Sequence, residues 1–163
     1  MRRRDREVTE ESEILHILDT AKTLHLGLVE DGKPYIVALA YGYAFENGHL
    51  VFYAHGATEG RKLDVIRKYP ACCAQLECDI APFQGRLACQ YGVSYYSLEG
   101  FGTAVVVEKP EEKMRALSLL MKTQTGKDFD FNEKLVSAVS VIRIDCEYYT
   151  AKHRPLPPRD IQA

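Results

Sequence analysis

Apolar residues recur along this chain with two spacings, one typical of strands and one of helices. Ile142, Ile144, Cys146 and Tyr148 alternate with polar neighbours, as in a strand with one buried face. The segment 59–69 instead places apolar residues at helical intervals and ends before a proline. The pattern predicts strands over 23–30, 35–45, 50–54, 71–79, 94–108 and 139–151, and helices capped by Thr9, over 59–69, after Pro110 and over 132–138.

Turn signals between these segments predict how the strands follow one another. Asp31-Gly32 and Asn47-Gly48 are strong signals for tight hairpins, so neighbouring strands should run antiparallel. Gly100 and Gly102 favour a bend or bulge within a long strand, a device that helps to close a barrel. We expect the segment 80–90 to be a loop or irregular edge. The sequence therefore predicts one α+β domain over residues 1–163, with 1–8 and 152–163 as extended tails.

The predicted strand 35–45 is apolar almost throughout, YIVALAYGYAF. A strand that faces water on one side alternates apolar and polar residues, whereas a strand covered on both faces does not. We therefore expect the core to cover one face of this strand, and a ligand or partner chain to cover the other.

Composition and charge exclude several classes of function. The chain has 163 residues and a net charge of −2, so it has no concentrated basic surface for nucleic acid. No apolar run follows the basic MRRRDRE start, which predicts neither a secretory signal nor a membrane helix.

Five cysteines without CxxC spacing favour free thiols in the cytoplasm. Since the adjacent Cys72 and Cys73 would point to opposite faces of a strand, we expect no metal site.

Two cations in the first turn of a predicted helix are the first sign of a binding site. Arg61 and Lys62 follow the small residues of HGATEG, at the helix end where the dipole favours anions by roughly 0.3–1 kcal/mol each. A phosphate held between these cations and the free backbone N–H groups would explain their position. The alternative is a solvated pair on a surface helix.

Four stretches together resemble one protein family: LGLVEDGKPYIVALAYGY, LVFYAHGATEGRKLDVIRKYP, YYSLEGFGTAVVVEKPEEKMRAL and VIRIDCEYYTAKHR. The chain resembles the pyridoxamine 5′-phosphate oxidase-like FMN-binding split barrels, and within them the branch of the nitroimidazole-resistance proteins. The resemblance covers nearly the whole chain. It implies a six-stranded antiparallel split β-barrel with flanking helices, and a homodimer that binds FMN between its subunits.

The resemblance also implies a set of site residues. Arg61 and Lys62 match the pair that holds the FMN phosphate, and His55 matches a histidine beside the flavin, which makes it the candidate catalytic residue. An imidazole exchanges protons near neutral pH, but for His55 contact with the cofactor is favoured over proton transfer. The other implied cofactor-binding positions are Leu39, Ala40, Tyr41, Tyr53, Ala54, Gly60, Tyr96 and Ser97.

The sequence departs from the family pattern at positions that are expected to affect substrate recognition more than phosphate binding. Ala38 and Ala40 stand where the family often has proline and asparagine, and the absence of tryptophan argues against a true pyridoxamine 5′-phosphate oxidase. The leading hypothesis is a flavin-dependent oxidoreductase acting on a small organic substrate, with nitro-group reduction as one activity. The alternatives are a barrel that binds flavin or haem without turnover, with His55 or His153 as the haem ligand, and FAD or a deazaflavin in place of FMN. We expect His16 and the remaining histidines to be ordinary surface or hydrogen-bonded residues.

Overall fold

The computed structural model describes residues 3–158. Its contacts group into two compact units, each assembled from separate stretches of the chain. Unit 1 comprises residues 1–21, 76–98 and 150–163, and unit 2 comprises 22–75 and 99–149. Residues 1–2 and 159–163, which we expected to be parts of extended tails, lie outside the described residues.

Eight strands form a single antiparallel sheet in the order β3-β2-β6-β7-β8-β5-β4, with β1 paired to β8. The strands are β1 (Glu7–Val8), β2 (Leu24–Glu30), β3 (Lys33–Leu39), β4 (Tyr41–Glu46), β5 (His49–Gly56), β6 (Ala71–Phe83), β7 (Gly92–Val107) and β8 (Ser140–Arg154). The helices are α1 (Glu11–Thr20), α2 (Arg61–Lys68), α3 (Pro110–Thr125) and α4 (Glu133–Val136), with 3-10 turns η1 (Arg4–Arg6) and η2 (Ala88–Gln90). In the described part of the chain, the sheet path ends at β3 and β4 and is not closed.

Both predicted hairpins are confirmed. β2 pairs with β3 around Asp31 and Gly32, and β4 pairs with β5 around Asn47 and Gly48. All four turn residues have positive φ, between 49° and 79°. Glycine, aspartate and asparagine tolerate this left-handed region, and two successive residues in it make a turn that matches the twist of the flanking strands.

Several predicted boundaries were wrong. The apolar segment 35–45 is two strands, β3 and β4, which separate at Ala40 and pair with different partners. β6 continues through Pro82 to Phe83, into the segment expected to be a loop. Glu10, rather than Thr9, precedes α1, and its carbonyl accepts the N–H of Ile14.

The expected tails also contain regular structure. At the N-terminus, η1 is followed by β1, which pairs Glu7 with Lys152 and Val8 with Ala151. At the other end, β8 continues to Arg154. The pairing of β1 with β8 satisfies backbone N–H and C=O groups that would otherwise form hydrogen bonds with water.

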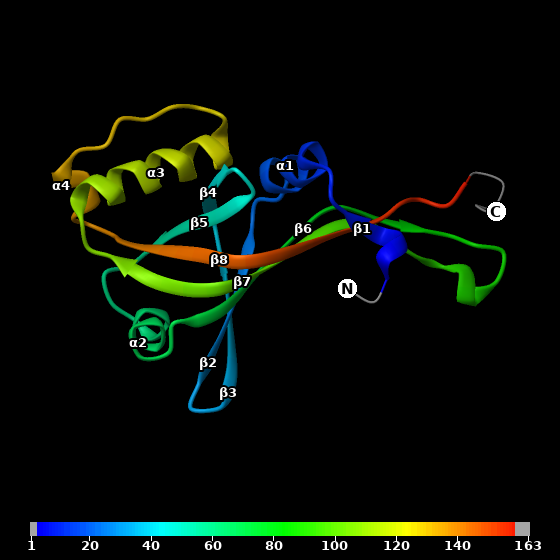
Figure 1. The fold of residues 1–163 in the computed structure, drawn as a ribbon, viewed down its shortest axis with the longest axis horizontal. Helices are drawn as coiled ribbons and strands as arrows, with labels where there is room; N and C mark the ends of the chain where they lie inside the picture. Colours follow the sequence, from blue (N-terminus) through cyan, green and yellow to red (C-terminus); the bar gives the residue numbers. More distant parts are fainter. Residues whose placement is uncertain (1–2, 159–163) are drawn as a thin grey trace. The chain divides into compact units, whose positions relative to one another are not determined.

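In unit 2, α3 packs against the β4–β5 hairpin (Figure 1). The core here joins Val51 and Tyr53 of β5 to Ala116 and Leu117 of α3. A Cβ atom on Gly42 would lie 2.3 Å from the backbone nitrogen of Leu120, so the absence of a side chain there lets α3 approach β4 closely.

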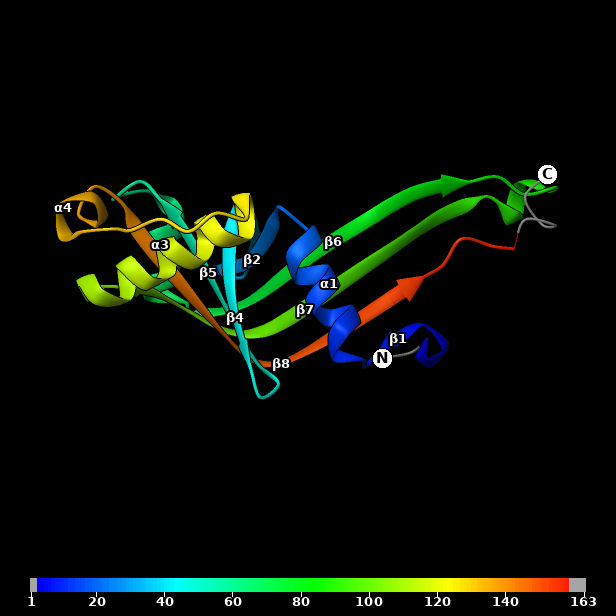
Figure 2. The ribbon, with the colours of Figure 1, turned by 90° about the horizontal axis from the view of Figure 1, so that it is seen from above.

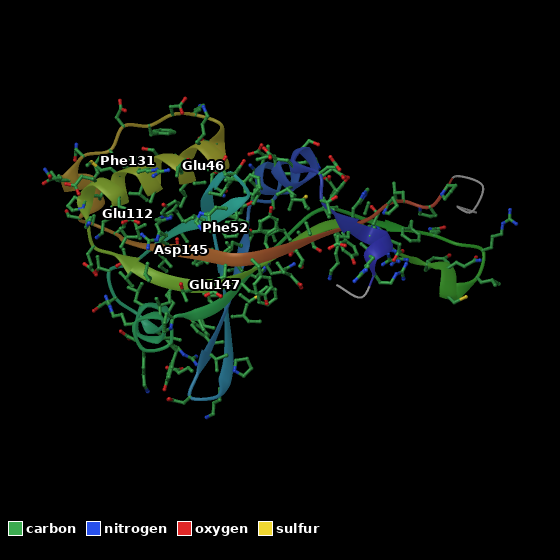
Figure 3. The ribbon with its side chains drawn as sticks, in the orientation of Figure 1. Glu46, Phe52, Glu112, Phe131, Asp145 and Glu147 are labelled. Atoms are coloured by element: carbon green, nitrogen blue, oxygen red, sulfur yellow. The ribbon has the colours of Figure 1, made fainter. Side chains whose placement is uncertain are left out.

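An ionic network fixes α3 to β8 within the same unit. Arg143 donates to Glu112 of α3 over 2.7 Å and to Asp145 of its own strand over 2.8 Å; both acids are labelled in Figure 3. Hydrogen bonds from Arg143 to Asp145 and Glu112 raise the pKa of its guanidinium. These groups are only partly exposed, so this pairing contributes more to the stability of the fold than an ordinary surface ion pair does.

In unit 1, α1 lies across the strands (Figure 2) and is joined to them by side-chain hydrogen bonds. His16 bonds to Asp79 of β6, and Tyr96 of β7 donates to Glu13 over 3.1 Å. Ile14, Ile17 and Leu18 form the buried face of α1. None of the helices in residues 3–158 has the length and hydropathy of a membrane span.

Candidate functional site

The candidate phosphate site lies where β5 ends and α2 begins, in unit 2. The small residues after Gly56 lead to Gly60, whose φ of 130° and ψ of 162° lie in a region that only glycine adopts readily. Gly60 precedes α2 and its carbonyl accepts the N–H of Leu63 over 2.9 Å. No side chain caps this helix end, and an uncapped helix start of this kind is suited to an anion.

Lys62 extends over Gly56 at this helix end. A Cβ atom built on Gly56 would lie 2.8 Å from both Cε and Nζ of Lys62, which means that the lysine fills the space left by the missing side chain. Within residues 3–158, Lys62 forms no ion pair. Its positive charge is therefore available to a ligand.

Arg61 differs from Lys62 because its charge is already matched. Its Nη2 and Nε atoms lie 2.7 and 3.0 Å from the same carboxylate oxygen of Glu30, and its guanidinium carbon lies 4.4 Å from the ring centre of Tyr35. Glu30 and Tyr35 belong to the β2–β3 hairpin, so Arg61 connects the start of α2 to this hairpin. A phosphate would have to compete with Glu30 for this arginine.

The other end of α2 is tied to the same hairpin. Lys68 lies 3.1 Å from Asp31, and the hydroxyl of Tyr69 also donates to that carboxylate. These hydrogen bonds, from Tyr69 first and Lys68 second, lower the pKa of Asp31. With a contact at each end, α2 has a defined position beside the hairpin.

The predicted flavin-ring positions divide between core and surface. Tyr41 is fully buried, packs edge-on against Phe52 at 5.5 Å, and its carbonyl accepts a hydrogen bond from Gln124 over 2.8 Å. Leu39 is also buried, whereas Ala40, between the two strands, is exposed. Of the side chains expected to face the ring, only Ala40 is on the surface of the described chain.

The surface of β3 is nevertheless apolar. Pro34, Ile36 and Ala38 alternate along one face and continue to Ala40, and all four are exposed, Ile36 by 67%. Ile36 lies opposite Gly27 of β2, which keeps this face flat. We call Pro34, Ile36, Ala38 and Ala40 the β3 face. An exposed apolar strip of this kind is typical of a binding surface.

Three predicted site residues, Tyr53, Ala54 and His55, follow one another on β5 and differ in their exposure to solvent. Tyr53 and Ala54 are buried, and burial raises the pKa of the Tyr53 hydroxyl. His55 is exposed and pairs with Val141 of β8. His55 directly precedes Gly56, the residue over which Lys62 extends.

Tyr96 and Ser97 belong to unit 1. Tyr96 stacks on His153, with ring centres 3.8 Å apart and planes 8° from parallel. Burial, followed by the hydrogen bond to Glu13, raises the pKa of the Tyr96 hydroxyl. Ser97 is partly buried on the same strand.

Sequence reasoning missed the residues that shape the phosphate site from outside its motif. Glu30 and Tyr35 contact Arg61 from another hairpin, and Gly56 makes room for Lys62. Gly56, in the loop before the basic pair, was a local signal of this space that could have been used. The ion pair with Glu30 joins positions 31 residues apart, and no local pattern indicates it.

The donor set fits a phosphate-bearing cofactor. An uncapped helix start, a lysine without an ion pair and an adjacent arginine all favour a dianion, and Glu30 is the one acidic group in contact with this pair within the described residues. Together with the fold, these features define an α+β sheet protein with a candidate anion site at the start of α2. A family model described as pyridoxamine 5′-phosphate oxidase matches residues 10–153, so the chain belongs to this family.

Three solved structures share the fold. A candidate 5-nitroimidazole antibiotic resistance protein from Bacteroides thetaiotaomicron is 23% identical, with a TM-score of 0.76 over 90% of this chain and 86% of that chain. The flavocytochrome Anf3 from Azotobacter vinelandii is 18% identical, with a TM-score of 0.76 over 97% and 73%. A FAD and haem binding protein from Mycobacterium smegmatis is 18% identical, with a TM-score of 0.73 over 95% and 78%. A search of curated proteins gave no match.

Proposed function

We propose that this protein binds FMN, with the phosphate at the start of α2 and the flavin ring near Ala40, the exposed residue among the predicted ring positions. The carrying observation is Lys62, which has no ion pair in the described structure and extends over Gly56 at an uncapped helix end. The family membership and the cofactors of the similar structures support a flavin as the phosphate-bearing group. FMN is favoured over FAD because its terminal phosphate carries both negative charges on one group, which suits a single anion position beside Lys62 and the first N–H groups of α2.

In this proposal, each part of the site has a physical role. Lys62 and the first N–H groups of α2 hold the phosphate through charge-assisted hydrogen bonds, roughly twice as strong as neutral ones. Arg61 adds a second cation when it exchanges Glu30 for the phosphate. The bound flavin supplies the electron transfer, and the chain supplies position and polarity.

His55 is the proposed catalytic residue. It is exposed at the end of β5, immediately before Gly56, and an imidazole donates or accepts a proton near neutral pH. Its role would be to exchange a proton with the substrate while the phosphate is held nearby.

We propose that a second copy of the chain covers the remaining apolar surface. Ile36 is 67% exposed and Val29 is 51% exposed, on the hairpin that carries Glu30. Burying such side chains stabilises an assembly by about 25 cal/mol per Å² of apolar surface. A homodimer with flavin between its subunits would remove both the β3 face and one side of the ring from water.

The reaction class we propose is oxidation or reduction of a small organic substrate, and nitro-group reduction is the example suggested by the Bacteroides relative. Flavin-dependent consumption of NADH or NADPH, with a nitroaromatic acceptor, would measure it. A protein that holds flavin but shows no turnover with donor and acceptor would instead be a cofactor-binding protein. A haem Soret band without flavin absorbance would indicate the haem-binding alternative, which the Mycobacterium and Azotobacter relatives suggest.

The phosphate assignment is tested by comparing FMN with riboflavin, which lacks the phosphate. The wild-type chain should bind FMN more tightly, and Lys62→Ala should reduce this preference by about tenfold or more, since a charged hydrogen bond contributes roughly 1.5–3 kcal/mol. Lys68→Ala is the matched control, because Lys68 lies at the far end of the same helix and pairs with Asp31. An FMN preference equal in wild type and Lys62→Ala would refute the assignment.

A further inference from the structure

Three side chains able to bind a metal meet in unit 1, at the contact of α1 with β6. His16 Nε2 lies 2.6 Å from Asp79 Oδ2, although the two residues are 63 positions apart. With Cys78 Sγ, these ligand atoms all lie within 4.8 Å of one another. We call His16, Cys78 and Asp79 the α1–β6 cluster. None of them belongs to the proposed flavin site.

A local distortion of β6 makes this cluster possible. Neighbouring side chains on a strand normally point to opposite faces, which would separate Cys78 from Asp79. Asp79 has a φ of 52°, in the left-handed region that few residues other than glycine adopt. The burial pattern changes there: Ala74, Leu76 and Cys78 are buried at alternate positions, whereas Ile80 is 58% exposed.

A change of phase at a residue with positive φ is typical of a β-bulge, which re-aims one side chain. Here the Asp79 carboxylate and the Cys78 sulfur lie close enough to share a ligand with the imidazole that α1 supplies. Residues held in such backbone conformations cluster at functional sites. The distortion and the convergence of three ligands are separate observations that indicate the same place.

The ligand set matches one metal particularly well. Imidazole nitrogen, cysteine sulfur and carboxylate oxygen are the three kinds of protein ligand that Zn²⁺ binds. The side chains of His16 and Asp79 are 45% and 47% exposed, which leaves room for water. The second ring nitrogen of His16 lies 3.4 Å from the hydroxyl of Thr20, an outer contact of the kind that orients metal-binding histidines.

We propose that the α1–β6 cluster is a mononuclear Zn²⁺ site with three protein ligands and a water molecule in the fourth position. Tetrahedral bonds of about 2.0–2.3 Å place ligand atoms roughly 3.3–3.8 Å apart. His16 and Asp79 must therefore separate by about 1 Å on binding, while Cys78 approaches them. On binding, the Cys78 thiol loses its proton to solvent and becomes a thiolate ligand, while His16 presents an unprotonated Nε2 and Asp79 a carboxylate oxygen to the ion.

The site would join two elements that are distant in sequence. α1 reaches β6 through His16, and Tyr96 of β7 lies beside this histidine, with ring centres 5.3 Å apart. A bound ion would hold α1 against the sheet of unit 1. Metal binding should therefore raise the midpoint temperature of thermal unfolding, since a ligand that binds the folded state alone stabilises it.

The test uses the untagged full chain, stripped with a chelator and titrated with Zn²⁺ and, separately, with Co²⁺ as a coloured probe. We expect one ion per chain and a thiolate-to-cobalt absorption band. Removing an outer-shell partner typically lowers metal affinity by roughly 10–100-fold. We therefore expect Thr20→Val to weaken binding by about tenfold, and Cys78→Ser, His16→Gln and Asp79→Asn to weaken it by at least about a hundredfold.

The variants are chosen to keep the fold. Asparagine tolerates the left-handed conformation of Asp79, and serine is close in size to Cys78. Cys89→Ser and His49→Gln are the matched controls, because both residues are exposed and lie outside the cluster. Circular dichroism confirms that each variant is folded before titration. Controls that bind like wild type, with loss confined to the cluster variants, would support the site.

Two results would overturn the proposal. One is a wild-type chain that binds neither ion, which would leave His16 and Asp79 as an ordinary ion pair. The other is cobalt bound without a thiolate band, or with an affinity unchanged in Cys78→Ser, which would place the ion elsewhere.

Discussion

Replacing Gly56 with alanine should weaken FMN binding without unfolding the protein. A Cβ atom at this position would lie 2.8 Å from Cε and Nζ of Lys62, closer than carbon atoms approach one another in folded proteins. Lys62 is the end of a flexible chain, so it would swing away rather than displace the backbone. The change therefore moves the proposed phosphate ligand while it leaves the lysine in the sequence.

The expected magnitude follows from the bond that is lost. A hydrogen bond to a charged group contributes roughly 1.5–3 kcal/mol, which corresponds to an increase in the Kd for FMN of about 10–150-fold. The free energy of unfolding should change by less than about 1 kcal/mol, because alanine loses less backbone entropy than glycine in a strand. Fluorescence titration with FMN and urea denaturation measure the two quantities.

A second glycine variant provides the opposite control. Gly126 ends α3 with a φ of 73°, so Gly126→Ala should cost about 1 kcal/mol of stability while the Kd for FMN stays unchanged. A Gly56→Ala protein that is stable and binds FMN as tightly as wild type would refute the role given to Lys62.

Three further outcomes are expected. Glu30→Gln removes the carboxylate that competes for Arg61, so the Kd for FMN should fall several-fold in a fluorescence titration; weaker binding would show that Glu30 helps to build the site. Phe52→Ala should lower the free energy of unfolding by about 3–5 kcal/mol in urea denaturation, since Phe52 is fully buried, and a loss below about 1 kcal/mol would contradict this packing. Burial raises the pKa of Cys72 and Cys146 from 9.0 to about 12, so the unfolded state loses these protons first and stability should fall as pH rises through this window; urea midpoints that stay constant there, or that do not respond to Cys146→Ala, would contradict the burial of these thiols.

The hairpins and the start of α2 were predictable because their signals are local. Asp31-Gly32 and Asn47-Gly48 occupy turn positions that demand positive φ, and few other residue pairs adopt it. The basic pair was visible because cations at a helix start oppose the dipole. In each case a few neighbouring residues carry the physical cause.

The break at Ala40 was not predictable for the opposite reason. Alanine is neither a turn residue nor a helix breaker, and apolar residues continue on both sides of it. Only the pairing shows that β3 joins β2 while β4 joins β5. Pro82 was also misleading, because it favoured a loop where β6 in fact continues to Phe83. Proline is tolerated where a strand does not need its N–H group.

The α1–β6 cluster was invisible for a third reason. The cysteines that lie close along the chain form no ligand set by themselves, and His16 and Asp79 are 63 positions apart. The irregular backbone at Asp79 also coincides with a break in the alternation on which strand predictions rest. Side chains brought together by tertiary structure and by an irregular strand leave no periodic signal.

The most direct test of the central claim is the visible spectrum of the purified chain after incubation with FMN and gel filtration. We predict that flavin absorbance elutes with the protein at one flavin per chain, at the elution volume of a dimer. Protein that elutes without flavin absorbance, while its circular dichroism shows a folded chain, would contradict the claim.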